Sequence, residues 1–443
     1  MTKREIAHII IEADTPLKVG SNSSDFLQDS PIQKDWNGLP MILGTSIAGV
    51  LRKHYRDENE NDDLFGFQRM DKKKENDLSE GSKVILSNAL LLDENKEVNE
   101  GLLLEKSNFL KIFDNLPIRE HTKIDHRGVT GSSKEYSKFD EEVVYKGVQF
   151  KFSLEVLDDA EAFKKLLEML QSPSFRLGGG TTKGFGKFKV LEIMSSVVDT
   201  AEALATYSSS LNSKKGSRVE LLTNVMPTKH STYRLKITPD DFFMFGSGFG
   251  DEQSDQTPVY EQVIDYKKGK LSDKQILIPA SSIKGALSHR TAFYYNKSQK
   301  LYADNLTTDE ERKKYIDENN DAVKAIFGHK KELADDKKTE LGQKGKLLIS
   351  DCFKEDKKES TKVFDHVSID RFTGGAIDGA LFQEKTIAQR DEWEVEILLE
   401  NDVNEAFVTA FENALDDVCM GMLALGGATT KGHGVFSGTW RKS

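Results

Sequence analysis

The sequence has few of the residues that covalent or metal-based frameworks require. Its 443 residues include only two cysteines, Cys352 and Cys419, which lie too far apart to form a Cys-X-X-Cys pair. A disulfide framework and a cysteine-rich zinc site are therefore excluded. Nine prolines and 33 glycines exclude collagen-like and proline-rich chains, and 37% hydrophobic residues exclude a wholly disordered one. We expect a folded protein of two or three domains.

Long hydrophobic runs and an excess of positive charge are also missing. No apolar stretch approaches the roughly 18 residues of a membrane-spanning helix, and the opening residues lack the features of a secretory signal. We therefore expect a cytoplasmic protein without a membrane segment. Lys and Arg number 62 against 73 Asp and Glu, a net charge of −11, which argues against a nonspecific nucleic-acid binder with a basic surface. Local basic grooves are compatible with this balance.

An internal repeat divides the chain into two halves. The segment LGGGTTKGFGKFKV at 177–190 recurs as LGGATTKGHGVFSGTW at 425–440, and MILGTSIAGVLRKHY at 41–55 recurs as ILIPASSIKGALSHR at 276–290. Three weaker matches lie between them in the same order: 64–66 with 326–328, 84–89 with 347–352, and 121–131 with 366–375. Collinear repeats of this kind predict two homologous domains.

The composition between the repeats predicts where the domains end. The segment 206–218 is rich in Ser, Lys and Gly, as linkers commonly are. We place a first domain at 1–195, a linker at 196–229 and a second domain at 230–443.

Each half has the pattern of strand, helix, strands, helix and strand. Strands are expected at 6–14 and 232–240, and late helices at 158–171 and 403–423. The first helix of each half is expected to be capped by a hydroxyl side chain, from Thr45 or Ser46 and from Ser281 or Ser282. This βαββαβ order predicts an α+β protein of two tandem ferredoxin-like domains, related to the RNA-recognition-motif plan.

The repeated glycine-rich loop suits a phosphate backbone. It offers exposed amide N–H groups, two hydroxyls and one ammonium, and its glycines permit close approach. It is not a Walker loop, because Lys183 and Lys431 are each followed by glycine and the loop leads into a strand. Tight turns with positive φ also explain the glycines, but they do not require a lysine in both copies.

Together these motifs resemble the RAMP superfamily of CRISPR-associated proteins. More narrowly, the chain resembles two fused Cas-seven-like backbone subunits of a type III, III-D-like, effector complex. The resemblance implies binding of the guide RNA (crRNA) and of complementary target RNA, and assembly with other subunits of that complex. It also implies a β-hairpin thumb in each domain, for which 129–147 and 372–386 are the candidates. An ordinary surface hairpin is the alternative.

The resemblance further implies a ribonuclease site at an aspartate after the first strand. Asp29 stands directly before Ser30-Pro31-Ile32, as the family pattern requires. We expect its carboxylate to accept the proton of the target 2′-hydroxyl or to hold Mg²⁺ (or Mn²⁺), giving in-line attack and a cyclic phosphate. In the second domain Asp255 is the best match, although its register against Pro258 is shifted by one. An aspartate before Ser-Pro also commonly starts a turn.

Loop chemistry and resemblance together predict the RNA contacts. They are Gly179, Thr181, Thr182, Lys183 and Gly184 in the first loop, Gly427, Thr429, Thr430, Lys431 and Gly432 in the second, and Ser46, Arg52, Ser281, Ser282, Lys284 and Arg290 in the first helix of each half. Four histidines also lie in repeated segments: His121, His126, His366 and His433. Guide-processing relatives use a histidine as general acid or base, whereas a structural histidine is more common.

These observations predict a crRNA-binding backbone subunit that cleaves target RNA at six-nucleotide intervals. Two alternatives stay open. One is a non-catalytic scaffold in the same complex, and the other is a metal-independent endonuclease that matures the guide transcript.

Overall fold

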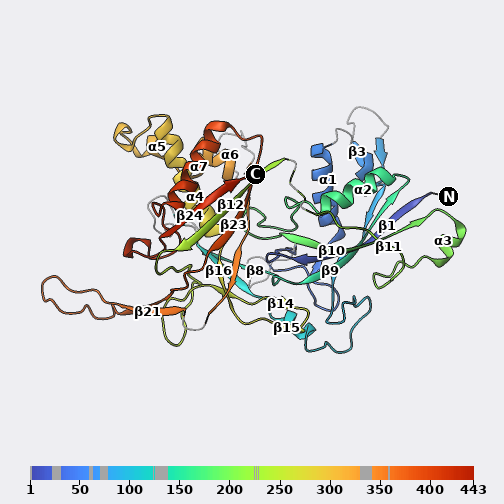
Figure 1. The fold of residues 1–443 in the computed structure, drawn as a ribbon, viewed down its shortest axis with the longest axis horizontal. Coiled ribbons are helices and arrows are strands. Elements are labelled where there is room, and N and C mark those ends of the chain that lie inside the picture. Colours follow the sequence, from blue (N-terminus) through green and yellow to red (C-terminus); the bar gives the residue numbers. More distant parts are fainter. Residues whose placement is uncertain are drawn as a thin grey trace.

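The computed structural model describes residues 2–21, 31–58, 63–69, 78–122, 124, 138–223, 225, 227, 229–329, 342–357 and 360–443. Two halves lie side by side, each with a β-sheet whose helices pack on the same side (Figure 1). Each half has its own large cluster of buried apolar side chains. The predicted α+β class is confirmed.

The first half is built on a long antiparallel sheet. β1 (Arg4–Ala13) pairs with β10 (Phe188–Val198) on one side and with β9 (Gln149–Leu157) on the other, and β5 (Val84–Leu86) pairs with β9. The sheet is extended by β2 (Met41–Ile42), β6 (Ala89–Leu91) and β11 (Ser217–Arg218). Helices α1 (Gly44–Glu58) and α2 (Ala160–Leu170) follow β1 and β9 in the chain. The four strands β10, β1, β9 and β5 therefore lie side by side in the order β10-β1-β9-β5.

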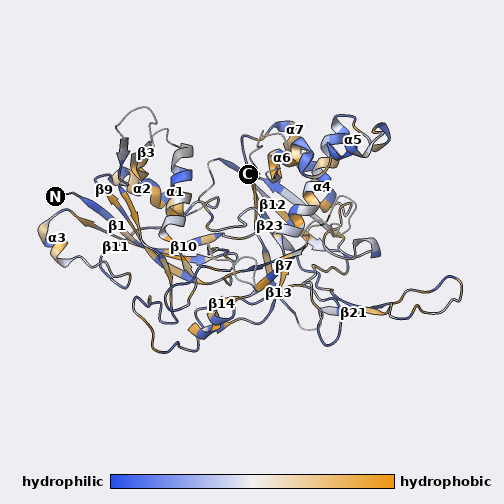
Figure 2. Ribbon diagram, turned by 180° about the vertical axis from the view of Figure 1, so that it is seen from behind, coloured by the Kyte–Doolittle hydropathy of each residue, from blue (hydrophilic) through white to orange (hydrophobic). Residues whose placement is uncertain are grey.

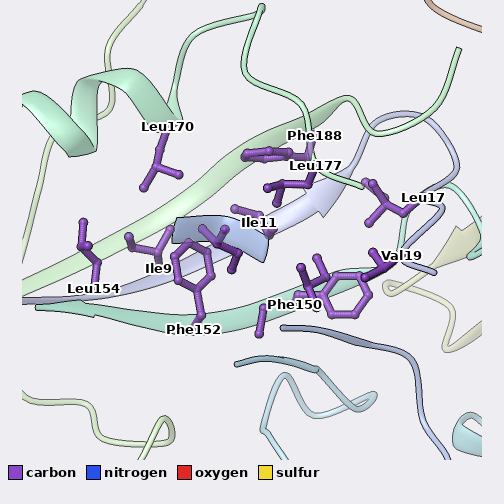
Figure 3. Close-up of a cluster of buried hydrophobic side chains, with 14 of the residues drawn as sticks. Ile9, Ile11, Leu17, Val19, Phe150, Phe152, Leu154, Leu170, Leu177 and Phe188 are labelled. Carbon is purple, nitrogen blue, oxygen red and sulfur yellow. The ribbon is translucent and has the colours of Figure 1, made fainter. Parts of the chain in front are cut away.

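Alternation along the strands builds the core of this half. Ile9 and Ile11 of β1 point to the same face as Phe150, Phe152 and Leu154 of β9, because side chains two residues apart share a face. Figure 3 shows these side chains packed with residues from the α2 end and the glycine-rich loop. The apolar stripe of α2 closes the cluster, and the Asp159 side chain caps that helix by accepting from Ala162 N.

The second half repeats this arrangement. β12 (His230–Pro239) lies between β23 (Trp393–Glu400) and β24 (Phe436–Lys442), and β19 (Leu347–Ile349) pairs with β23, giving the order β24-β12-β23-β19. Helices α4 (Ala280–Ser298) and α7 (Glu405–Cys419) follow the first and third of these strands in sequence. The core side chains come from both sheet and helices and include the buried Trp393 and Phe411.

The remaining short helices and strands lie outside the main strands of the two sheets. They are β3 (Phe67–Arg69), β4 (Leu78–Glu80), α3 (Ala201–Thr206), β13 (Tyr260–Glu261), β14 (Ile264–Asp265), β15 (Lys270–Leu271), β16 (Gln275–Ile278), α5 (Asp309–Lys313), α6 (Asp321–Phe327), β17 (Gly328–His329), β18 (Gln343–Lys344) and β20 (Cys352–Glu355). Figure 2 shows apolar residues interspersed along the strands of the sheets and the helices next to them, whereas α5 is largely hydrophilic. Within the described ranges, no helix combines the length and hydrophobicity that a membrane crossing requires.

One hairpin in each half stands apart from the sheets. In the first half β7 (Ile118–Thr122) pairs with β8 (Lys138–Glu142), and in the second β21 (Thr361–His366) pairs with β22 (Phe382–Ile387). The β21–β22 hairpin projects from one end of the molecule (Figure 1). The part of the candidate thumb 129–147 that precedes β8 lies outside the described residues, and 138–147 are described.

The first helices do not start as the sequence predicts. α1 begins at Gly44 and α4 at Ala280, so the predicted caps Thr45, Ser46, Ser281 and Ser282 lie within the first turn. The caps come instead from a strand end: Asn88 Oδ1 accepts from Gly44 N at 2.9 Å, and Asp351 Oδ1 accepts from Ala280 N at 2.8 Å. The prediction of hydroxyl caps was wrong, because a residue distant in sequence supplies the acceptor.

Much of the segment 196–229, predicted as a linker, packs on the first half. β10 continues to Val198, and β11 pairs with β10. Leu211 is buried in a small cluster with Met41, Leu90 and Leu92. The segment therefore adds to the first half before the chain enters β12.

A buried ion-pair network joins the halves. The Arg119 guanidinium on β7 donates to Asp351 Oδ2 at 2.6 Å and to Glu261 Oε2 at 2.9 Å, and all three residues are buried. Burial alone would lower the pKa of Arg119, but the two carboxylates raise it above its ordinary value. Beside this network Arg176 donates to Ile349 O at 2.8 Å and to Ser350 Oγ at 3.0 Å, and Lys187 Nζ lies 2.9 Å from Glu396 Oε1.

A second contact crosses between the halves through the β14–β15 hairpin. Ile264 of this hairpin is buried in the core of the first half, and its amide donates to Lys146 O at 2.9 Å. The Tyr266 hydroxyl donates to Leu92 O at 2.8 Å, and its ring packs on Phe109. Residues of the second half thus complete the core of the first.

We predict that Arg119→Met destabilises the protein by about 3–5 kcal/mol, because removing one partner of a buried ion pair leaves Glu261 and Asp351 as buried charges without compensation. Urea unfolding followed by circular dichroism measures this. Arg4→Met, which removes the more exposed pair with Glu155, is the matched control and should cost less than about 1 kcal/mol. Equal unfolding midpoints for Arg119→Met and the unmodified chain would contradict the assigned role.

Candidate nucleic-acid interface

Both glycine-rich loops are anchored to the chain segment that follows the first strand. Gly179 N donates to Lys18 O and Gly427 N to Met244 O, each at 2.7 Å. The preceding glycines, Gly178 and Gly426, have φ of 83° and 94°, and a Cβ on either would lie 2.3 Å from the same carbonyl. These two glycines are therefore required by the protein's own backbone and not by a ligand.

The first loop is packed against the second half. Gly184 has φ of 114°, and a Cβ there would lie 2.2 Å from Asp351 Oδ1 and 2.8 Å from Ala280 Cβ. Thr181 is only 7% exposed. Both residues are buried in this arrangement, and their assignment as RNA contacts stays a prediction. Gly179 is exposed, and Thr182 and Lys183 are half-buried. These three residues are therefore at least partly accessible to solvent.

The second loop is open. Thr429, Thr430 and Lys431 form a short 3-10 turn, and these residues and Gly432 are exposed. No atom lies within 4 Å of a Cβ built on Gly432 among the described residues. Gly427 is half-buried beside Met244. The two copies of the motif therefore share a conformation but not an environment.

Each loop lysine sits over an aromatic ring at the base of a hairpin. In the first half Lys183 Nζ lies 4.9 Å from the ring centroid of Phe139, and His121 stacks on the same ring at 5.1 Å. In the second half Lys431 Nζ lies 4.6 Å from the centroid of Phe382, on which His366 stacks at 4.7 Å. Cation and aromatic ring attract each other in this geometry.

A buried glutamate completes each cluster. Glu141 Oε2 lies 3.3 Å from His121 Nε2, and Lys18 Nζ lies 2.5 Å from its other oxygen. Glu384, 1% exposed, has Oε2 at 3.2 Å from His366 Nε2 and 3.3 Å from Lys431 Nζ. Burial would raise the pKa of Glu141, but hydrogen bonds from His121 and Lys18 outweigh it and hold the pKa at about 2. Glu141 is therefore an anion at neutral pH, beside His121 and Lys18.

The sequence analysis missed the aromatic and acidic members of these clusters. Phe139 and Glu141 recur as Phe382 and Glu384 with the same Phe-X-Glu spacing, in strands that belong to equivalent hairpins. That recurrence was the available signal. Of the other histidines, His433 is buried against Phe242 and Phe364, and His126 lies outside the described residues.

Cations from both halves converge beside the first loop. Lys284 of α4 donates to Thr182 Oγ1 at 3.4 Å, so the structure brings together two predicted contacts from different halves. Burial and the neighbouring ammonium groups of Lys183 and Lys344 lower the pKa of Lys284 to about 8. Within the part of the chain that the structure describes, no carboxylate pairs with Lys284. An anion at this junction would offset the repulsion that Lys183 and Lys344 exert on the Lys284 ammonium.

The cationic region continues into a cavity of about 1290 Å³ between the halves. Burial lowers the pKa of Arg176 to about 10, and burial together with His54 and Arg176 lowers that of His230 to about 4. The lining includes the cations Lys53, Lys164, Lys165, Arg176, Lys229 and Lys344, and the acids Asp159, Glu161, Glu168, Glu400 and Asp402. Such a polar lining suits a charged, hydrated ligand better than an apolar small molecule.

The basic residues of the first helices are already engaged. Arg52 donates to Gly66 O at 2.9 Å, and Arg290 pairs with Asp417 of α7 and stacks on Phe293. Both therefore have partners within the fold, and their assignment as RNA contacts stays a prediction. Ser282 is exposed, and Ser46 and Ser281 are half-buried at the helix starts.

The two acidic loops have the same length. Gly20 bridges to Ile32 and Gly246 to Pro258, in each case twelve residues apart, and Ser21 N and Ser247 N donate to Pro31 O and Thr257 O at 2.9 Å. Asp29 and Asp255 each follow the bridging glycine by nine residues. The one-residue shift inferred from the prolines is therefore not present in the backbone register. Asp29 itself lies outside the described residues.

The described part of the second acidic loop does not fit a divalent cation. Asp255 Oδ2 accepts from Gln383 N at 2.7 Å, and Asp251 pairs with Lys385 at 2.5 Å. Among the described residues no three His, Cys, Asp or Glu side chains form a cluster able to hold a metal ion. Asp255 does lie beside β22, the strand that carries Phe382 and Glu384. The prediction of Mg²⁺ or Mn²⁺ at Asp29 stays untested.

Comparison with known proteins agrees with the repeat. The family model of the RAMP superfamily matches residues 10–189 and 260–437, so it covers most of both halves. The sequence gives no significant match to curated proteins. Both matched segments contain the first helix, the hairpin and the glycine-rich loop described above. The chain belongs to the RAMP superfamily, with one region of the family in each half.

Proposed function

We propose that the chain is a guide-RNA-binding backbone subunit of a type III CRISPR effector complex. The observation that carries the proposal is the junction of the halves, where Lys284 of the second half donates to Thr182 of the first loop at 3.4 Å and where burial, Lys183 and Lys344 lower the pKa of Lys284. A nearby anion favours the charged form of a buried lysine that has cationic neighbours. A phosphate backbone that passes over the junction supplies that anion, in a chain whose net charge is −11.

The strand order supports a fusion of two Cas-seven-like modules in a III-D-like system. Numbered along each half, the four main strands run 4-1-3-2 in both sheets, with a helix after the first and third. This is the order of ferredoxin-like domains, to which we assign both halves.

The β21–β22 hairpin supports a thumb. Its tip exposes apolar side chains that no core requires: Val367, Ile369, Phe372, Ile377 and Leu381. An exposed apolar tip suits insertion between stacked bases, which is what a thumb does to a guide–target duplex. The base of the hairpin carries the Lys431 cluster, so the thumb and the phosphate-binding lysine are held together.

Target cleavage is the second part of the proposal. Asp29 accepts the proton of a target 2′-hydroxyl, the freed oxygen attacks the adjacent phosphorus, and the 5′-oxygen leaves with formation of a cyclic phosphate. We extend the proposal to Asp255 in the second half, because its loop has the same length as the loop of Asp29. A non-catalytic scaffold is the second candidate, favoured by the hydrogen bond that ties the Asp255 carboxylate to β22.

We predict that Lys183→Ala with Lys431→Ala weakens guide binding about tenfold and reduces the slope of log K against log salt by about 1–2, because each lysine neutralises one phosphate. Filter binding at several salt concentrations measures both quantities. Lys357→Ala with Lys442→Ala removes two lysines that pair with Asp391 and Glu412 elsewhere, and should change neither. Unchanged affinity in the loop variant would refute the phosphate assignment.

We predict that guide affinity falls at alkaline pH through Lys284. The pKa of Lys284 is lowered to about 8, so below pH 8 the charged form is already present and binding is strongest. Above pH 8 binding requires uptake of a proton, and affinity should fall by up to roughly tenfold for each pH unit. Lys284→Arg keeps the charge and should bind independently of pH between 7.5 and 9.5. The same decline in both proteins would assign the effect to another group.

We predict that Asp29→Asn and Asp255→Asn each remove one of two target cuts spaced six nucleotides apart, while guide binding is kept. Sequencing gels of a labelled complementary target, cut by the complex purified with its guide, resolve the two sites. Asp251→Asn is the matched control, because Asp251 shares the loop but pairs with Lys385, and it should leave both cuts. Cleavage that survives both substitutions would favour the scaffold.

A further inference from the structure

The cavity between the halves is a separate feature from the loop and hairpin clusters. Its walls include α1, α2 and the start of the first glycine-rich loop and, from the second half, the start of β12, the end of β23 and residues 344–348. In Figure 1 α1 and α2 lie at the top of the molecule, whereas the hairpins β14–β15 and β21–β22 lie at the bottom. Among the described residues, the lining contains neither hairpin base and none of Lys183, Lys284 and Lys431.

A buried guanidinium lies in the cavity wall. Arg176 is 3% exposed, whereas the other cations of the lining are exposed or half-buried. Its terminal nitrogens donate to Ile349 O and Ser350 Oγ, but its Nε has no hydrogen-bond partner. Neighbouring acids raise its pKa less than burial lowers it, and the pKa is about 10. Because a buried charge is costly without a close counter-charge, an anion in the cavity would be stabilised beside Arg176.

A second nitrogen without a partner belongs to the same wall. His230, the first residue of β12, lines the cavity and has a buried Nδ1 that forms no hydrogen bond. Burial, with smaller contributions from His54 and Arg176, lowers the pKa of His230 to about 4. The imidazole is therefore neutral at pH 7, where it has one N–H group to donate.

Two lysines carry positive charge to the surface of the cavity. Lys53 of α1 and Lys344 of β18 are exposed, line the cavity and come from different halves. Desolvation and then Lys53 lower the pKa of Lys344, Glu400 partly raises it, and Arg176 lowers it further. Lys53 and Arg176 therefore both disfavour the charge of Lys344, and an anion placed among them would favour it.

The acids of the lining favour a compact ligand over a long strand. Glu161 and Glu168 are exposed on α2, and Asp402 pairs with Lys346 at 2.6 Å. A polynucleotide that ran through the cavity would carry its phosphates past these carboxylates, which repel them. A single phosphate group can contact the cations without that cost. A terminal phosphate also carries nearly two negative charges at neutral pH, whereas an internal phosphodiester carries one.

We infer that the cavity between the halves binds a terminal phosphate group, which Lys53 and Lys344 contact beside the buried Arg176. The cavity of about 1290 Å³ exceeds ordinary ligand pockets of roughly 300–1,000 Å³, so it has room for a nucleoside next to the phosphate. The ligand is therefore a free nucleotide or the phosphorylated end of an RNA strand. Because the two lysines belong to different halves, the bound phosphate also links the halves.

Calorimetric titration of the nuclease-treated full chain tests the inference, with AMP as the probe and adenosine as its control. We expect AMP to bind one site per chain, and adenosine, which lacks the phosphate, to show no binding up to about 5 mM, well above a dissociation constant of ~1 mM. Lys53→Ala and Lys344→Ala should each weaken AMP binding about tenfold, because each removes a charge-assisted contact. These variants carry the test, since Arg176 also joins the halves.

Two further variants are matched controls. Lys164→Ala removes an exposed lysine from the α2 side of the same lining and should change AMP affinity less than about twofold, as for a solvent-screened charge. Lys183→Ala with Lys431→Ala leaves the lining intact and should bind AMP as the unmodified chain does, so failure of guide binding is distinguishable from failure here. Equal binding of AMP and adenosine, no binding of AMP, or equal losses in Lys164→Ala and Lys344→Ala would each overturn the inference.

Competition with short RNA distinguishes the two sources of the phosphate. A tetranucleotide that displaces AMP with a 5′-phosphate but not with a 5′-hydroxyl identifies the end of an RNA strand as the ligand. Binding of AMP that neither tetranucleotide displaces identifies a free nucleotide. Equal displacement by both tetranucleotides would assign the cavity to internal phosphates of a strand and contradict a site for a terminal phosphate.

Discussion

The buried guanidinium of Arg119 fixes the relative position of every candidate RNA-binding element at the junction. Its two acceptors belong to different parts of the second half, and one of them, Asp351, also caps α4 with its other oxygen. Its own strand, β7, carries His121 two residues later. One charged group therefore couples the hairpin base of the first half to the helix start of the second, beside the place where Lys284 reaches Thr182 of the first loop.

Repetition made much of the fold predictable. The strands at 6–14 and 232–240 and the helices at 158–171 and 403–423 agree with β1, β12, α2 and α7 within a few residues, because alternation and amphipathic spacing are local properties. The helix starts were not predictable in the same way, because Asn88 and Asp351 reach them from 44 and 71 residues away. A sequence pattern can indicate only caps that are close in sequence. The nearby hydroxyl residues were therefore predicted as caps, and the distant acceptors were missed.

The candidate site was predictable as a set of motifs but not as an arrangement. Two nearly identical loops suggested two equivalent surfaces, yet Gly184 is buried by Asp351 while Gly432 is open, because the first loop packs against the second half. Arginine is a residue type that commonly contacts phosphate. Here Arg52 donates to the carbonyl of Gly66 and Arg290 pairs with the carboxylate of Asp417, both within the fold. The different environments of the two loops arise from tertiary packing. Two nearly identical sequence motifs give no sign of this difference. The equal lengths of the acidic loops, by contrast, could have been found by counting from Gly20 and Gly246.

The β14–β15 hairpin has a consequence for the order in which the protein is made. Ile264 and Tyr266 fill places in the core of the first half, although they are encoded after β12, the first strand of the second half. Synthesis proceeds from the N-terminus, and domains commonly fold as they leave the ribosome. Here the nascent first half remains unfinished until this distant hairpin emerges, so the two halves mature together and a chain truncated at the apparent boundary lacks part of its own interior.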